Sequence, residues 1–139
     1  MMQEERLPRE EWLMAMAEII AQRSTCNRLR VGALIVRSHR IVSTGYNGNV
    51  SGMPHCNHPR DSSRCETAVH AEANALIFAA RTGLSTEGAS LVTTHQPCLE
   101  CAKLIVNAGI SQVRFRDTYR SDDGLILLRE AGVQVCQSA

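Results

Sequence analysis

The chain has 139 residues, which suits one compact domain with its own hydrophobic core, so we expect a single domain over residues 1–139. Its 15 basic and 14 acidic residues give a formal net charge of +1, which argues against stable binding along a nucleic acid. The first twelve residues are polar where a signal peptide needs an apolar centre, and nowhere do about 18 apolar residues run together as a membrane span requires. We therefore expect a cytoplasmic protein with no membrane partner.

The first half of the chain predicts a helix followed by a β-hairpin. After Pro8, apolar residues recur at helical spacing behind an acidic first turn, until about Ser24. Two β-branched runs, "VGALIVR" and "IVSTGYN", flank the polar turn "SHR", which is typical of an antiparallel hairpin from Val31 to about Tyr46. Residues 47–67 are mostly small and polar. A loop of this length is usually functional, held by a cross-link or a bound metal ion, or both.

The second half of the chain alternates helices and strands. In order, these are the helix "AVHAEANALIFAARTG", the strand "ASLVTT", the helix "CLECAKLIVNAG", the strand "SQVRFR", the helix "DDGLILLREAG" and the strand "VQVC". Gly83 and Gly109 are typical helix ends. This alternation predicts an α/β layered fold with parallel strands in this half and the hairpin at one side.

The chain has six cysteines, and we expect the protein to be in a reducing compartment. There, cysteines are more naturally thiols or metal ligands than disulfides, and their clustering near histidines points toward metal. The six are Cys26, Cys56, Cys65, Cys98, Cys101 and Cys136. Cys136 falls on the last predicted strand, where we expect a small core residue.

Two short motifs carry the candidate chemistry. Cys98 and Cys101 form "PCLEC" directly after a strand, where the dipole at a helix N-terminus favours the thiolate form. With His70 they make three candidate zinc ligands, and zinc held by three protein ligands keeps a fourth position for water, whose pKa falls from about 15.7 to about 7. Glu72, two residues after His70, can reach the same cavity and carry protons between water and substrate.

Each motif alone has a more ordinary interpretation. A lone H-x-E at a helix start is more often a charge arrangement with a solvent-exposed histidine, and a lone C-x-x-C is mostly a structural zinc half-site or a redox pair. The order H-x-E and then P-C-x-x-C on successive helices is far more specific. This combined signature is that of zinc deaminases acting on cytosine or adenine.

Longer stretches extend this signature from about Cys26 to Val135. They are "VGALIV", "GYNG" followed by "SGMPHC", "HAEANAL", "TTHQPCLECAKLIVNAGI" and "AGVQV". Through them the chain resembles the cytidine deaminase-like superfamily and, within it, the deoxycytidylate (dCMP) deaminases of phages and bacteria. His95 and Gln96, directly before Pro97, depart from the smaller polar residues expected of that family.

This resemblance implies a cytidine deaminase-like three-layer α/β/α sandwich with a mixed five-stranded sheet. It implies zinc-dependent hydrolysis of dCMP to dUMP and ammonia, which supplies dUMP for dTTP synthesis, with Glu72 protonating N3 of the base and relaying a proton to the departing ammonia. The family is commonly a homohexamer that dCTP activates and dTTP inhibits. The implied partners are therefore dCMP as substrate and the two triphosphates as effectors.

A second set of cysteines, Cys26, Cys56 and Cys65, remains, with His55 and His58 in the same polar loop. Independent thiols are the ordinary interpretation, but the loop has no core of its own, and three cysteines with one histidine form a closed structural zinc set. Some of the dCMP deaminases that the chain resembles carry a second, structural zinc in this region. We expect its ligands to be Cys26, Cys56, Cys65 and His58, with His55 as the alternative fourth ligand.

Four residues are candidate substrate contacts. Arg28 and Arg30 precede the first strand, and a guanidinium suits a phosphate, although at least one of the two is more typical of a solvated charge. By resemblance Asn47 is the best contact other than the metal ligands, and Tyr119 is a weaker candidate for contacting phosphate or stacking. The resemblance also favours a nucleotide-effector contact in one short segment: Gly45, Tyr46, Asn47 and Gly48.

Other functions remain open at this stage. Another cytosine substrate, cytidine or dCTP, would use the same chemistry. A tRNA adenosine deaminase shares the signature, but a basic surface and more aromatic residues would suit it better than one Trp, two Tyr and two Phe. A zinc-stabilised binding module is the non-enzyme alternative, and Glu72 argues against it because a structural site has no use for a carboxylate beside an open position.

Overall fold

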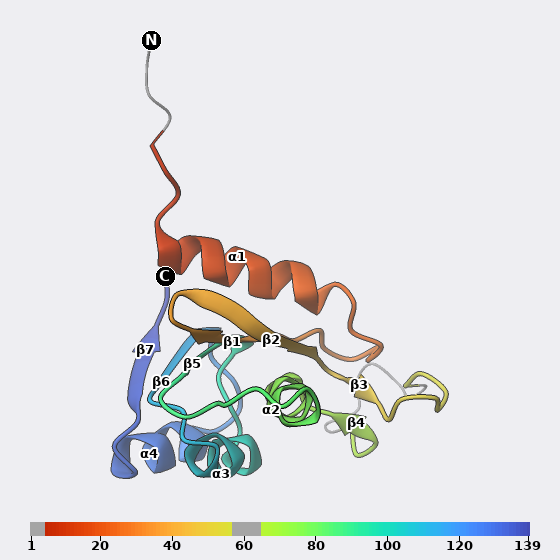
Figure 1. Cartoon of the computed structure of the whole chain (residues 1–139). Helices are drawn as coiled ribbons and strands as arrows, with labels where there is room; N and C mark the ends of the chain where they lie inside the picture. Colours follow the sequence, from red (N-terminus) through yellow and green to blue (C-terminus); the bar gives the residue numbers. More distant parts are fainter. Residues whose placement is uncertain (1–4, 57–64) are drawn as a thin grey trace.

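The computed structural model describes residues 5–56 and 65–139, which form a five-stranded sheet between layers of helices (Figure 1). The elements are, in chain order, α1 (Arg9–Ala21), β1 (Gly32–Arg37), β2 (Arg40–Tyr46), β3 (Gly48–Asn49), β4 (Ala68–Val69), α2 (Ala71–Arg81), β5 (Ser90–His95), α3 (Leu99–Asn107), β6 (Gln112–Asp117), α4 (Asp123–Glu130) and β7 (Gln134–Gln137). None of the helices in these two described ranges is long and apolar enough to cross a membrane.

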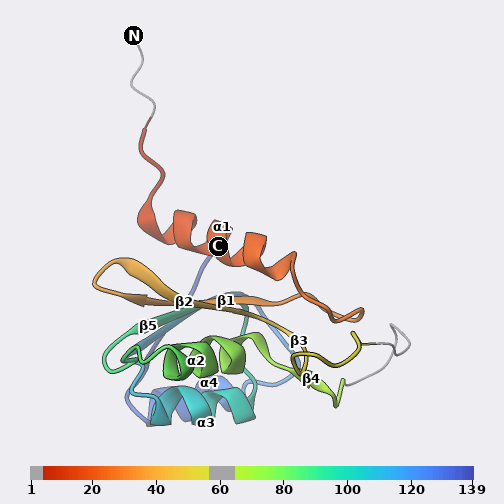
Figure 2. The same ribbon diagram turned by 45° about the vertical axis from the view of Figure 1, so that its right-hand side comes forward.

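The sheet has the strand order β2-β1-β5-β6-β7. Strand β1 pairs antiparallel with β2 and β5, while β5, β6 and β7 are parallel. Helix α1 covers one face, and α2, α3 and α4 cover the other, as the two views in Figures 1 and 2 agree. The predicted mixed sheet, with the hairpin at one side and helices on both faces, is confirmed.

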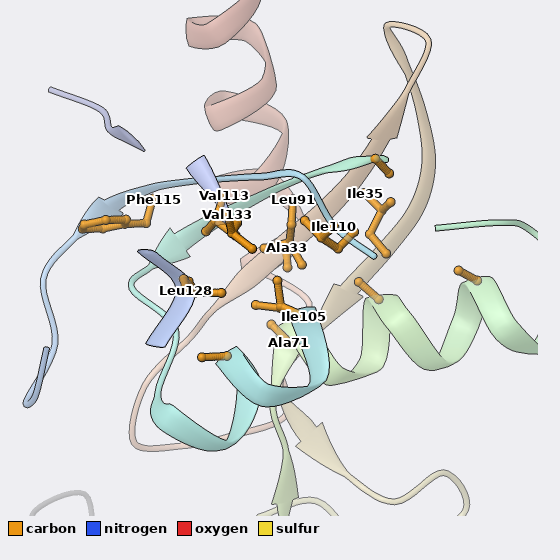
Figure 3. Packing of buried hydrophobic residues seen from close by; sticks show 14 of the residues in the cluster. Ala33, Ile35, Ala71, Leu91, Ile105, Ile110, Val113, Phe115, Leu128 and Val133 are labelled. Carbon is orange, nitrogen blue, oxygen red and sulfur yellow. The ribbon is translucent and has the colours of Figure 1, made fainter. Parts of the chain in front are cut away.

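Hydrophobic residues on both faces of the sheet explain its central position. Along β1, Leu34 and Val36 pack in the cluster under α1, whereas Ala33 and Ile35 belong to the larger cluster under the other helices, because successive side chains of a strand point to opposite faces. Figure 3 shows the larger cluster, with Ile105 of α3 among the sheet residues. A strand buried on both faces is nearly all apolar, as "GALIV" is.

The hairpin turn is a two-residue loop. Arg37 pairs with Arg40, and Ser38 and His39 between them have φ angles of 51° and 63°. Positive φ at both central residues matches the right-handed twist of the flanking strands, so the turn is tight although neither residue is the glycine that this conformation favours.

Three sequence-based expectations need correction. Residues 68–69 form β4, which pairs with β3, so the helix begins only after His70. The first helix ends at Ala21 rather than near Ser24. Cys136 is half-buried on the last strand and accepts a hydrogen bond from Gln112, so it is not a core residue.

Glycine lets β2 lie directly against α2. A Cβ on Gly45 would collide with the backbone oxygen of Ala71 and the backbone nitrogen of Ala75. This close approach brings the end of β2 beside the first turn of α2. The residues that follow β2 and those that begin α2 therefore meet at one end of the sheet.

Candidate active site

The candidate site lies at the sheet edge where β5 and β6 end and β1 begins. In open α/β sheets, ligands bind outside the carboxyl ends of parallel strands. A pocket at this edge is lined by Arg28, Leu29, Val31, Asn47, His70, Ala71, Glu72, His95, Gln96, Cys98 and Tyr119. Most of the residues predicted for the catalytic zinc, the proton transfer and the substrate contacts thus border one pocket.

Three predicted zinc ligands come together at the starts of two helices. His70 is the N-cap of α2, Cys98 is the N-cap of α3, and Cys101 lies in the first turn of α3. His70 Nδ1 lies 3.3 Å from Cys101 Sγ and 3.5 Å from Cys98 Sγ. With bond lengths of about 2.1 Å to nitrogen and 2.3 Å to sulfur, a tetrahedral zinc separates its ligand atoms by about 3.6–3.8 Å. The three residues therefore fit a zinc ion.

One of the three candidate ligands, Cys98, is shifted toward its anionic form. The hydrogen bond with Cys101 lowers the pKa of the Cys98 thiol to about 4, and the backbone N–H of Cys101 also donates to this sulfur at 3.5 Å. A hydrogen bond with Cys98 raises the pKa of His70. A separate hydrogen bond with Cys98, together with burial, raises the pKa of Cys101. Because the thiolate is the form that binds metal, the lowered pKa of Cys98 suits coordination.

Glu72 lies on the first turn of α2 and borders the same pocket. Its side chain is buried, with 5% of the residue surface exposed, and burial raises the pKa of its carboxyl group. A carboxyl group with a raised pKa exchanges a proton closer to neutral pH, which suits a general acid and base. The burial and position of Glu72 thus suit proton transfer in the pocket, and that role stays a prediction.

Asn47 braces the segment that precedes β1. Its Oδ1 accepts hydrogen bonds from the backbone N–H of Val31 at 2.9 Å and from the Ser24 hydroxyl at 2.6 Å, and its Nδ2 donates to the Leu29 carbonyl at 2.7 Å. An amide nitrogen carries two N–H groups, so one more is available to a ligand. Its substrate contact stays a prediction, beside this structural role.

Arg28 and Tyr119 form one wall of the pocket, although they lie far apart in the sequence. Arg28 Nη2 donates to the Tyr119 hydroxyl at 2.7 Å. In the described part of the chain, the buried Nε of Arg28 has no hydrogen-bond partner, and no carboxylate forms an ion pair with its guanidinium. A half-buried guanidinium that pairs with no carboxylate of the described residues suits an anionic ligand group.

The remaining candidate residues differ in whether they border the pocket. Arg30 does not border the pocket, and its exposed side chain donates to Gln22 instead. His95 and Gln96 do border it, although the sequence marked them only as unusual neighbours of the "PC" motif. Their position at the end of a strand, directly before a candidate ligand, was the sequence signal that they could lie near the site. The sequence could not show which side of the strand faces the pocket.

The second cysteine cluster also assembles. Ligand atoms of Cys26, Cys56 and Cys65 all lie within 4.8 Å of one another, and the sulfur atoms of Cys56 and Cys65 are 3.8 Å apart. Burial raises the pKa of Cys56 to about 11, whereas hydrogen bonds from Ala68 and Thr67 outweigh burial and lower that of Cys65 to about 6. His58 lies outside the described residues. Among those described, His55 is not in this cluster.

The predicted effector segment separates two pockets. Asn47 borders the pocket with the zinc ligands, while its neighbours face a second pocket on the other side. Lining residues of the second pocket include Gly45, Tyr46, Gly48, Asn49, Asn74, Phe78 and Arg81. Asn74 Nδ2 donates to the Tyr46 carbonyl at 2.9 Å, so the segment is fastened to α2 at this point.

Comparison with known families agrees with this geometry. The family model of the cytidine and deoxycytidylate deaminase zinc-binding region matches residues 7–116, which include both zinc-ligand motifs. The chain belongs to this family. It is therefore a deaminase with the zinc-binding region of its family.

Curated relatives come from bacteria, fungi and phages. The chain is 39% identical to ComE operon protein 2 of Bacillus subtilis over 137 residues, covering 96% of the chain and 72% of the relative. It is 38% identical to the deoxycytidylate deaminase of Saccharomyces cerevisiae over 139 residues, covering 92% of the chain but only 44% of the yeast enzyme. It is 32% identical to the deoxycytidylate deaminase of Enterobacteria phage T2, covering 88% of each. The chain thus spans less than half of the fungal relative and most of the phage relative.

A solved structure matches over nearly the whole chain. The dCMP deaminase of cyanophage S-TIM5, in complex with dCMP and dUMP, has a TM-score of 0.89 and 37% sequence identity, covering 97% of this chain and 100% of that one. The apo form of the same enzyme has a TM-score of 0.83. The cytidine deaminase-like fold is therefore confirmed.

Proposed function

We propose that this chain, acting as a single domain in the cytoplasm, hydrolyses dCMP to dUMP and ammonia. One observation carries the proposal: a single pocket has the candidate metal triad and a buried glutamate at one side, and at another an arginine that pairs with no carboxylate of the described residues. The first set suits attack on an amidine carbon, and the arginine suits a phosphate. The relatives and the solved structure named dCMP deaminases support the same substrate.

His70, Cys98 and Cys101 would hold the catalytic zinc. A zinc ion bound by them would supply an activated water at neutral pH, because it lowers the pKa of that water to about 7. Glu72 takes the proton from the attacking water and delivers it to N3 of the cytosine ring. It then takes the proton of the new hydroxyl group on C4 and delivers it to the exocyclic amino group, so that the C4–N bond breaks, ammonia leaves and the C4 carbonyl of uracil forms.

Arg28, Tyr119 and Asn47 would hold the rest of the nucleotide. The guanidinium of Arg28 would pair with the 5′-phosphate, which explains why, within the described residues, no carboxylate pairs with it and its Nε has no hydrogen-bond partner. The Tyr119 hydroxyl keeps Arg28 in position. The free N–H of Asn47 would donate to the sugar or the base.

A substrate comparison tests the proposed function. Ammonia release or the ultraviolet change is followed with dCMP, dCTP, cytidine, deoxycytidine and a tRNA anticodon stem, for the wild type and Arg28→Met. We expect the highest kcat/KM with dCMP, and a loss of about tenfold or more for dCMP in the variant, because one charge-assisted contact is removed. A wild type that prefers a nucleoside or the tRNA stem would refute the proposal.

The second cysteine cluster is proposed to hold a structural zinc. Cys26, Cys56 and Cys65 would be three ligands, since the 3.8 Å between two of their sulfur atoms matches the spacing of about 3.8 Å in a tetrahedral thiolate site. His58 or His55 would be the fourth. This ion would order a polar segment that has little apolar surface to bury.

Regulation by dCTP as activator and dTTP as inhibitor is proposed for a homohexamer. The second pocket supports an effector site, because the segment 45–48 separates it from the substrate pocket. Exposed apolar side chains around the second pocket support contact between copies of the chain. They are Tyr46, Val50, Met53, Ile77 and Phe78.

A further inference from the structure

The connection between β6 and α4 determines one wall of the substrate pocket. Residues 118–122 carry Tyr119, whose hydroxyl accepts a hydrogen bond from Arg28 Nη2. Its ring centre lies 5.9 Å from Cζ of Arg28 and 5.3 Å from Cζ of Arg120. A shift of this connection would therefore move the guanidinium that we assign to the phosphate.

Gln96 fastens this connection at both ends. Its backbone N–H donates to the Asp117 carbonyl at 2.9 Å, at the point where β6 ends. Its side-chain Nε2 donates to the Ser121 carbonyl at 2.7 Å and to Asp122 Oδ1 at 3.2 Å, where α4 begins. Tyr119 lies between the two attachment points, so one residue limits the movement of the whole connection.

The hydrogen bonds require the amide of Gln96 to face the connection in one orientation. Both side-chain partners are acceptors, so Nε2 must face them. The residue is only 3% exposed, and within the described ranges its Oε1 is buried without a hydrogen-bond partner. An apolar side chain of the same length would fill this space without leaving a buried acceptor that has no hydrogen bond. Packing alone therefore does not account for a glutamine here, whereas its two donated hydrogen bonds do.

The attachment also reaches the metal-ligand side of the pocket. Gln96 precedes Pro97 and the ligand Cys98 in the chain. A Cβ on Gly124 in the first turn of α4 would collide with the Pro97 carbonyl and come within 2.9 Å of the Cys98 carbonyl carbon. Helix α4 thus packs directly on the backbone beside Cys98, and Gln96 joins that backbone to the wall that carries Tyr119.

We propose that Gln96 is a positioning residue that holds Tyr119, and through it Arg28, where they bind the 5′-phosphate, so that the enzyme favours a nucleotide over a nucleoside. This inference rests on the proposed dCMP deaminase function. Gln96 acts through the connection and donates no proton to the substrate. Its effect is therefore expected in substrate binding rather than in the chemical step.

Steady-state kinetics of Gln96→Met with dCMP and with deoxycytidine tests the proposal. The variant keeps the length of the side chain but loses both donated hydrogen bonds. We expect the KM for dCMP to rise about fivefold, with kcat and the KM for deoxycytidine within about twofold of the wild type, since deoxycytidine has no phosphate. Gln112→Met is the matched control, because Gln112 lies on β6 away from the pocket lining. It should change none of these values beyond about twofold.

Two further variants distinguish positioning from general damage. In a Tyr119→Phe background, Gln96→Met should raise the KM for dCMP by less than about twofold, because the contact through which Gln96 acts is already lost. Asp122→Ala removes one partner at an exposed position, and it tests the attachment even if Gln96→Met does not fold; it should raise the KM for dCMP about twofold.

Several results would overturn the proposal. These are equal changes in KM for dCMP and deoxycytidine, full additivity with Tyr119→Phe, or no change in KM in either attachment variant. A wild type without preference for dCMP over deoxycytidine would instead refute the proposed function itself. Failure of the proposal for Gln96 can thus be distinguished from failure of the proposed dCMP deaminase function.

Discussion

Glu72 is the residue on which turnover should depend most. It lies buried on the first turn of α2 and borders the pocket beside His70. Glu72→Gln keeps the shape of the side chain but removes the proton that it exchanges. We expect kcat to fall about 100-fold or more while zinc content is unchanged, because general acid–base catalysis contributes about 100-fold to 10,000-fold.

Turnover measured beside metal analysis checks this prediction. Glu100→Gln is the control, since Glu100 is an exposed residue of α3 that pairs with Lys103. Near-normal activity in Glu72→Gln would remove Glu72 from the mechanism. Loss of zinc together with activity would mean that Glu72 supports the ligands rather than the proton transfer.

Individual site residues differed in how well the sequence predicted them. His70, Cys98 and Cys101 were predictable because each motif is local, and the structure brings their ligand atoms together. Arg30 was not, since two arginines two residues apart look alike until the chain folds and only Arg28 turns to the pocket. Gln96 had no local signal for its role, because its partners lie 25 and 26 residues away.

At the scale of elements, the order of the segment between β2 and α2 should depend on a bound metal ion. Its described ends bring Cys56 and Cys65 to Cys26, which precedes β1. We expect about two zinc ions per purified chain and about one in Cys56→Ser, because each cluster of ligands holds one ion. Elemental analysis of the protein measures this directly.

Cys136→Ser is the matched control for the metal count, since Cys136 lies on β7 outside both clusters. It should retain about two zinc ions. A wild type with one zinc would contradict the second site. A Cys56→Ser protein that kept two would exclude Cys56 as a ligand.

The contact between β2 and α2 should be intolerant of any side chain at Gly45. The atoms that a Cβ would strike belong to the backbone of α2, which cannot move aside as a side chain can. We expect Gly45→Ala to lower the free energy of unfolding by about 2–3 kcal/mol, because overpacking forces backbone shifts. Urea denaturation measures the change.

Gly52→Ala is a suitable control because a Cβ there would meet nothing within 4 Å. Its φ of +83° disfavours alanine, so we expect a loss of about 1 kcal/mol from backbone strain alone. The interpretation of the β2–α2 contact would fail if Gly45→Ala cost no more than this control.

Element boundaries show the limit of local pattern. The helical spacing of "AVHAEANAL" was correct from Ala71 onward, but it could not reveal that residues 68–69 pair with residues 48–49 as β4 and β3. A two-residue strand has no periodicity of its own, and its hydrogen bonds depend on partners 19 and 21 residues away. The hairpin was predictable because its partners are neighbours in the chain.

At the scale of the whole molecule, the two pockets on either side of residues 45–48 predict cooperative regulation. We expect the rate to depend sigmoidally on dCMP concentration, and dCTP to shift the curve toward hyperbolic, because an effector that binds the active form better favours it at every linked site. Sigmoidal dependence also requires more than one site, as a homo-oligomer provides.

Initial rates over a range of dCMP concentrations, with and without dCTP, measure this effect. Addition of dTTP should shift the curve in the opposite direction. A hyperbolic curve that dCTP leaves unchanged would count against both the effector site and the coupling between copies.

By itself the sequence determined the fold class, the family and the candidate metal ligands, because periodicity, turn residues and the two short motifs are local properties of the chain. Only the tertiary structure decided which arginine borders the pocket, that Asn47 braces the segment before β1, and that Gln96 holds the connection to α4. These are contacts between residues distant in sequence, and they exist only after strands of the sheet have been placed side by side. The physical reason is that side-chain type sets what a residue can bind, whereas packing sets which partners come within reach.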